Sequence, residues 1–157
     1  MPAETARDSA GIADPPLLVY WVILGRITLP GRPERVREAR HFVARMLGDA
    51  HPHAETAVLL TSELMTNAIR HTRSGLPGGT VELVVAAKAA DFMVSVIDAG
   101  SDATVPEPAS SPGAENGNGL LLVATLSDDW GHAVKDERTA VWFRMSMSRR
   151  LNGALAG

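Results

Sequence analysis

The segment from Ala54 to His71 constrains the fold of this chain most, because apolar residues recur along it at the spacing of an α-helix. The stripe consists of Ala57, Val58, Leu60, Thr61, Leu64, Met65, Ala68 and Ile69. A stripe of this width predicts a helix that packs against a sheet. Glu63 and Asn67 stand one turn apart among these residues, so both project from nearly the same face. We therefore expect a polar pair on an anchored helix, with Arg70 near that face.

The composition narrows the classes of protein to which such a helix can belong. The chain has 157 residues, a net charge of −3 and no cysteine. A domain of this size buries enough surface to fold without disulfides or a structural metal. The charge gives no general reason to bind nucleic acid or an anionic membrane, and we expect neither. The lack of cysteine excludes thiolate metal sites and is compatible with the reducing cytoplasm, where we expect the protein.

The rest of the sequence indicates one domain from residue 17 to residue 148. Residues 1–16 lack the apolar core of a secretion signal, so we expect a disordered tail there, and residues 149–157 form a C-terminal tail. Strands are predicted at residues 17–29, 80–87, 92–97, 130–135 and 139–147, and helices at residues 34–47, 54–71 and 120–126. Residues 100–119 show no apolar periodicity, which predicts a lid over residues 101–118.

This order of elements predicts an α+β fold. The simplest assembly is a two-layer α/β sandwich, in which a mostly antiparallel mixed sheet is covered on one face by about three helices.

Three further motifs place polar or flexible residues at the ends of predicted elements. Asp98 to Gly100 ends a strand, and Arg138 to Phe143 begins another with the hydroxyl of Thr139. Gly117 to Leu120 begins a helix, where glycines let backbone N–H groups approach phosphates and the helix dipole favours anions. Each motif alone is more simply a turn or a solvated surface. All four in this order converge on one chemistry, and the P-loop pattern GxxxxGK[ST] is absent.

Together the motifs resemble the GHKL ATPase superfamily, which has the Bergerat fold, and within it the small anti-sigma-factor serine kinases. The resemblance covers about residues 26–147 and is most specific at residues 63–71 and 117–123, with residues 126–131 beside them. It implies ATP and Mg²⁺ as ligands.

The resemblance also implies a role for each matching residue. Glu63 would be the catalytic general base, and Asn67 would be a Mg²⁺ ligand, roles that suit a carboxylate and a carboxamide oxygen. Asp98 would accept a hydrogen bond from the adenine amino group. The full set of implied nucleotide-binding residues is Asn67, Arg70, Asp98, Gly100, Gly117, Asn118, Gly119, Leu120 and Thr139.

Two features differ from the family pattern. Asp102 stands where the family usually has a second glycine, and residues 101–116 contain no Lys or Arg. Phosphate binding would therefore rest on backbone amides, Mg²⁺, and Arg70 or Arg73.

The leading hypothesis is an anti-sigma-factor serine/threonine kinase that phosphorylates an anti-sigma-antagonist partner, with a sigma factor as the second candidate partner. The resemblance further implies a homodimer. The alternative is a non-catalytic module that sequesters a partner, with ATP as a structural ligand or absent. The catalytic half of a split sensor kinase ranks lowest, because the sequence shows no phosphoacceptor-histidine dimerisation helix.

Overall fold

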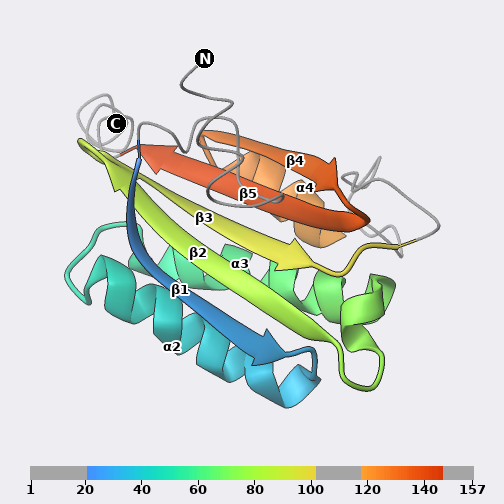
Figure 1. Ribbon diagram of the computed structural model, residues 1–157. Coiled ribbons are helices and arrows are strands. Elements are labelled where there is room, and N and C mark those ends of the chain that lie inside the picture. Colours follow the sequence, from blue (N-terminus) through green and yellow to red (C-terminus); the bar gives the residue numbers. More distant parts are fainter. Residues whose placement is uncertain (1–20, 102–117, 147–157) are drawn as a thin grey trace.

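The computed structural model describes residues 21–101 and 118–146 of the chain, and it has two layers. Figure 1 shows a twisted sheet with helices on one of its faces. The strands are β1 (Val22–Pro30), β2 (Thr80–Lys88), β3 (Asp91–Asp98), β4 (Asp129–Lys135) and β5 (Arg138–Ser146). They lie in the order β1-β2-β3-β5-β4, and each neighbouring pair is antiparallel. The predicted α+β fold with a mostly antiparallel sheet is therefore confirmed.

The helices that cover the sheet are α2 (Val36–Leu47), α3 (Ala54–His71) and α4 (Asn118–Leu126). Two short 3₁₀ turns, η2 (Pro33–Arg35) and η3 (Arg73–Gly75), precede α2 and follow α3. Helix α3 has the bounds that the sequence predicted, residues 54–71. Helix α4 begins two residues earlier than predicted, because Asn118 and Gly119 already adopt helical conformation. No helix within the described ranges combines the length and apolarity that crossing a membrane requires.

Several predicted boundaries lie outside the described residues. These are the N-terminal part of the first strand at residues 17–20, the lid at residues 102–117, Met147 and both predicted tails. The lid and the domain boundaries at residues 17 and 148 stay predictions.

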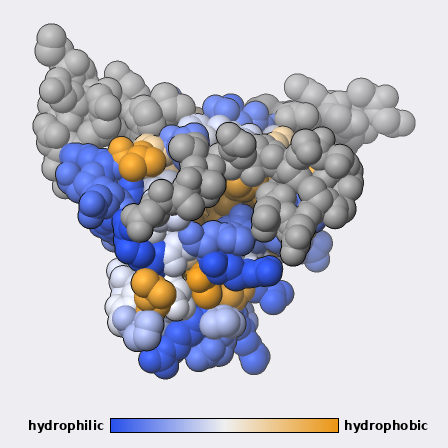
Figure 2. Space-filling view, turned by 90° about the vertical axis from the view of Figure 1, so that its right-hand side faces the viewer, coloured by the Kyte–Doolittle hydropathy of each residue, from blue (hydrophilic) through white to orange (hydrophobic). Residues whose placement is uncertain are grey.

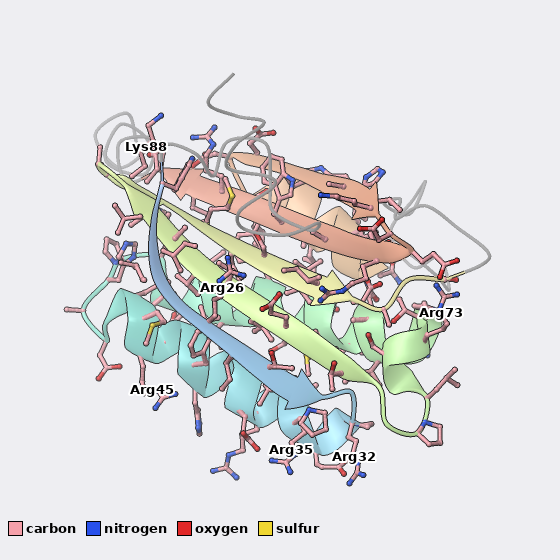
Figure 3. All side chains as sticks on the ribbon, in the orientation of Figure 1. Arg26, Arg32, Arg35, Arg45, Arg73 and Lys88 are labelled. Atoms are coloured by element: carbon pink, nitrogen blue, oxygen red, sulfur yellow. The ribbon has the colours of Figure 1, made fainter. Side chains whose placement is uncertain are left out.

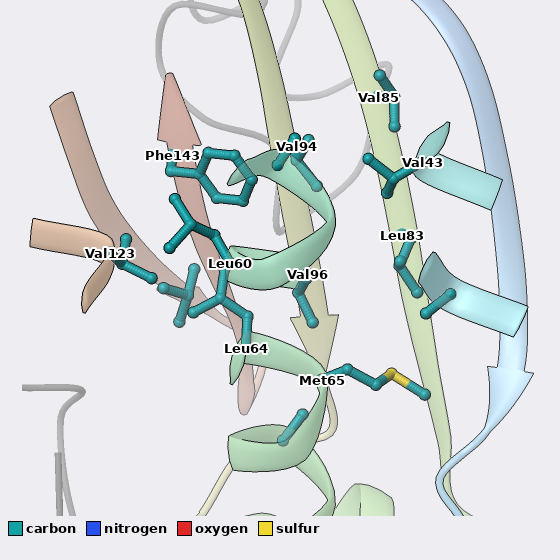
Figure 4. Packing of buried hydrophobic residues seen from close by; sticks show 14 of the residues in the cluster. Val43, Leu60, Leu64, Met65, Leu83, Val85, Val94, Val96, Val123 and Phe143 are labelled. Carbon is teal, nitrogen blue, oxygen red and sulfur yellow. The ribbon is translucent and has the colours of Figure 1, made fainter. Parts of the chain in front are cut away.

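The hydrophobic core lies between α3 and the sheet (Figure 4). The predicted stripe on α3 supplies Ala57, Leu60, Leu64, Met65 and Ala68, which are all buried. They meet inward-facing residues of the strands, namely Leu83, Val85, Val94, Val96 and Phe143. Because neighbouring residues of a strand point to opposite faces, these positions form one continuous apolar surface under the helix. The core therefore fixes the rotation of α3 about its axis.

Truncating the buried stripe is expected to destabilise the fold much more than truncating its exposed neighbour. Leu60 has 0% of its surface exposed, whereas Leu59 has 42% exposed. Leu60→Ala should lower the free energy of unfolding by about 2–5 kcal/mol, because it leaves a cavity in the core. Leu59→Ala is the matched control and should change it by less than about 1 kcal/mol. Urea unfolding measures both values, and equal losses would contradict this packing.

Candidate functional site

Helix α3 presents Glu63 and Asn67 to the first turn of α4. A Cβ atom built on Gly119 would lie 2.9 Å from Oε2 of Glu63 and 3.4 Å from Nδ2 of Asn67. Both polar side chains thus approach one point on the backbone of α4. Glycine permits this approach, because any side chain there would displace the carboxylate of Glu63. Two motifs that are far apart in the sequence are therefore brought together.

The beginning of α4 has the properties of an anion site. Asn118 is its exposed first residue, while Leu120 is buried in the main core and anchors the helix. The N–H groups of a first helical turn have no partners within the helix, and the helix dipole makes that end positive. The first turn of α4 contains no acidic residue of its own, and the carboxylate of Glu63 on α3 lies beside it. Gly117, which sequence analysis also assigned to the nucleotide, lies outside the described residues.

Asp98 and Thr139 form a second polar pair, at the end of the sheet. They are directly opposite each other in the antiparallel pairing of β3 and β5. Their residues have 6% and 8% of their surface exposed. A carboxylate and a hydroxyl at adjacent buried positions offer an acceptor and a donor to a polar ring such as a nucleobase.

Burial changes the acidity of Asp98. It raises the pKa of this carboxyl from 3.8 to about 6, since desolvation disfavours the charged form. The Gly100 N–H donates a hydrogen bond of 2.6 Å to Oδ1 of Asp98. This hydrogen bond and the positive charges of Arg138 and Arg73 act in the opposite direction and lower the pKa. With a pKa of about 6, the Asp98 carboxyl is mostly ionised at pH 7 and takes up its proton as the pH falls through 6.

Gly100 is required by its backbone conformation and by its neighbours. Its φ angle is 84°, which L-residues with side chains rarely adopt. A Cβ atom at this position would lie only 1.7 Å from the carbonyl oxygen of Glu137, in the turn between β4 and β5. The fold thus explains this glycine, and its predicted proximity to a base remains a separate expectation.

Ser74 and Arg73 are part of this region, although sequence analysis gave no role to Ser74. The Ala99 N–H donates to Oγ of Ser74 at 2.8 Å, and the Arg73 N–H donates to the Gly100 carbonyl at 2.9 Å. Nη2 of Arg73 donates to the Glu137 carbonyl at 3.2 Å. Sequence analysis suggested Arg73 as a phosphate ligand, but its guanidinium group lies beside Gly100. The sequence signal for this arrangement is limited to a hydroxyl residue in a glycine-rich segment after a predicted helix.

Arg70 is the predicted site residue that the structure does not connect to the others. It is exposed on the last turn of α3, and no hydrogen bond or ion pair joins its side chain to another described residue. Its proposed contact with phosphate stays a prediction.

A surface hollow lies elsewhere on the described part of the molecule. It has a volume of about 460 Å³ and is lined by Ile27, Glu38, His41, Ala44, Arg45 and Asp49. None of the candidate site residues lines it. Figure 2 shows the side of the molecule where β3 ends, and the apolar surface of the coloured residues there is divided into small areas by hydrophilic ones.

Replacing Asp98 with asparagine should change how stability depends on pH. Above pH 6 the buried carboxylate is charged, so Asp98→Asn should be more stable than the wild type, by up to about 3 kcal/mol at about 1.4 kcal/mol per pKa unit. As the pH falls from 6 towards 4, the folded wild type gains a proton that the unfolded chain lacks, and the difference should disappear. Denaturant unfolding at pH 4, 6 and 8 measures this.

The matched control for this prediction is Asp49→Asn, which removes an exposed carboxylate. It should show no comparable gain at pH 8. A difference between Asp98→Asn and wild type that stays constant from pH 4 to pH 8 would contradict the raised pKa.

Comparisons with known proteins agree with this arrangement. A solved structure of the RsbU and RsbW domains of Rv1364c from Mycobacterium tuberculosis matches with a TM-score of 0.58 and 16% sequence identity. The match covers 78% of this chain and 31% of that chain, and at this identity it shows a shared fold. A search of curated proteins found no match. The family described as the histidine kinase-like ATPase domain matches residues 29–145, which include every described site residue. The chain therefore belongs to the histidine kinase-like ATPase domain family.

Proposed function

We propose that this protein binds Mg²⁺-ATP and transfers the γ-phosphoryl group to a Ser or Thr hydroxyl of a partner protein, an anti-sigma antagonist. The observation that supports this most is the contact of Gly119 with Glu63 and Asn67. It combines a helix N-terminus suited to phosphates with a carboxylate and a carboxamide suited to the chemistry of transfer. The family to which the chain belongs supports ATP as the nucleotide.

In this proposal the nucleotide base binds at the end of β3. Asp98 accepts a hydrogen bond from the adenine amino group, and the Thr139 hydroxyl lies at the adjacent position of β5. Asn118, Gly119 and Leu120 offer backbone N–H groups to the phosphates, because they form the first turn of α4.

The residues around Gly119 fit a magnesium ion. Mg²⁺ prefers oxygen ligands and is usually held by one or two side chains together with phosphates and water. Asn67 would hold it through Oδ1, since the orientation of its amide is an assignment that a half-turn reverses. The bound ion would neutralise part of the phosphate charge.

Glu63 would remove the proton from the attacking hydroxyl. As the partner's oxygen bonds to the γ-phosphorus and the bond to the β-phosphate oxygen breaks, the hydroxyl proton passes to the carboxylate. Its partly buried position next to α4 keeps the carboxylate at the anion-binding end of that helix.

The resemblance to anti-sigma-factor kinases is the basis for four further parts of the proposal. These are the class of partner, a sigma factor in the same circuit, a homodimer and a cytoplasmic location.

Replacing Glu63 should abolish transfer while nucleotide binding persists. Glu63→Gln keeps the shape of the side chain but cannot accept the proton, so phosphorylation of an antagonist protein by Mg²⁺-ATP should fall by about 100-fold or more. Calorimetry should show ATP affinity within a few-fold of wild type. Radiolabelled phosphate transfer measures the rate.

The matched control is Glu55→Gln, which removes an exposed carboxylate from the first turn of the same helix. It should leave transfer unchanged. Equal transfer by wild type and Glu63→Gln would remove the proposed base. ATP binding without transfer to any antagonist would favour the partner-sequestering module.

Replacing Asn67 should weaken the effect of magnesium on nucleotide binding. In the wild type, ATP affinity should rise when Mg²⁺ is added. In Asn67→Ala this increase should shrink by about tenfold, because one ligand of the ion is lost and tenfold corresponds to about 1.4 kcal/mol. Calorimetric titrations with Mg²⁺ and with EDTA measure it, with Glu55→Gln as control. An unchanged magnesium effect would exclude Asn67 as ligand.

A further inference from the structure

We propose that Ser74 is a positioning residue that sets the adenine specificity of the site by holding Asp98 through the Ala99 N–H. This inference rests on the proposed function, because it takes the end of β3 as the adenine site. It concerns a residue outside every motif that suggested nucleotide binding.

Ser74 lies in a turn that continues directly from α3. Thr72 ends the helix, and its hydroxyl donates to the Ala68 carbonyl at 2.6 Å. The same oxygen accepts the Ser74 N–H at 3.1 Å. The hydroxyl of Thr72 thus connects the last turn of α3 to the 3₁₀ turn η3, so the position of Ser74 follows from that of the helix.

Ser74 is buried and closely surrounded by other parts of the backbone. The residue has 0% of its surface exposed. Cβ atoms built on Gly31 and Gly79 would lie 1.9 and 2.2 Å from its carbonyl oxygen, so two further backbone segments are in close contact with the turn. The Gly31 N–H also donates to the Gly79 carbonyl at 3.0 Å. The turn that carries Ser74 is therefore closely packed, which restricts the movement of this residue.

Ser74 and Arg73 hold consecutive residues of the segment that follows Asp98. Oγ of Ser74 accepts the Ala99 N–H at 2.8 Å, and the Arg73 N–H donates to the Gly100 carbonyl at 2.9 Å. The Arg73 guanidinium group adds a hydrogen bond to the Glu137 carbonyl. Figure 3 shows Arg73 at the end of the sheet where β3 ends. The Gly100 N–H donates to Oδ1 of Asp98 at 2.6 Å, so the backbone that Ser74 and Arg73 hold in place in turn directs the carboxylate.

The direction of this carboxylate decides which base is preferred. Adenine presents an amino group, which donates a hydrogen bond to a carboxylate. Hypoxanthine presents a carbonyl oxygen at the same place, and two acceptors repel each other. A site built to bond a donor rejects the analogue that lacks it more strongly than an apolar pocket would. Loss of the Ser74 hydroxyl would leave the Ala99 N–H without its buried acceptor. The segment that carries the Gly100 N–H would then be held less firmly, and the carboxylate that this N–H bonds would be less well directed.

The test compares the binding of ATP and inosine triphosphate to the full chain by calorimetry in the presence of Mg²⁺. The wild type should prefer ATP. Ser74→Ala should lower ATP affinity by about tenfold and leave inosine triphosphate affinity within about twofold, so the preference falls. Ser127→Ala is the matched control, since Ser127 is also buried and its hydroxyl bonds the Val123 carbonyl, away from β3. It should keep the preference even if the melting temperature falls.

A second variant covers the case in which Ser74→Ala does not fold. Ser74→Cys keeps nearly the same volume but has a weaker acceptor, and it should lower the preference for ATP in the same direction. An ATP preference equal to wild type in a folded Ser74 variant would overturn the role of Ser74 and leave the proposed function intact. A wild type that binds neither nucleotide would overturn the proposed function itself.

Discussion

The packing of α3 on the sheet is the interaction on which the other features of the molecule depend. Leu60, Leu64 and Met65 are buried against the strands, so the helix cannot rotate about its axis. This orientation directs Glu63 and Asn67 towards the first turn of α4. The same helix continues into the turn that bonds the backbone after Asp98. The apolar stripe of α3 therefore helps to position both parts of the candidate site, the Glu63–Asn67 pair and the segment that follows Asp98.

The elements were predictable from sequence where local pattern and tertiary packing agree. The apolar period along α3 and the β-branched residues of β2 and β3 each indicate one structure, and the observed elements follow them. The start of α4 was placed two residues late, because glycine disfavours helices and Gly119 is helical through its fit against Glu63. That contact joins residues far apart in the chain, so the helix propensities of neighbouring residues cannot predict it.

The residues of the candidate site that belong to sequence motifs were predictable. Glu63, Asn67, Asp98 and Thr139 stand at the ends or on the faces of regular elements, and the structure pairs the first two near Gly119 and the last two across β3 and β5. Ser74 was missed because its partner, the Ala99 N–H, lies 25 residues further along. A serine followed by a glycine is typical of any turn, so only the tertiary structure distinguishes Ser74.

Gly100 illustrates how a residue can be essential for two separate reasons. Its left-handed conformation and its closeness to the Glu137 carbonyl would exclude a side chain even if no nucleotide ever bound. A descendant that had lost ATP would still need this glycine to close the β4–β5 turn over β3. Its retention among relatives would consequently report the architecture of the sheet, while Asp98, whose burial costs stability, would be free to change once the ligand was gone. Evolutionary loss of nucleotide binding in this fold should therefore be sought at the acid and not at the glycine.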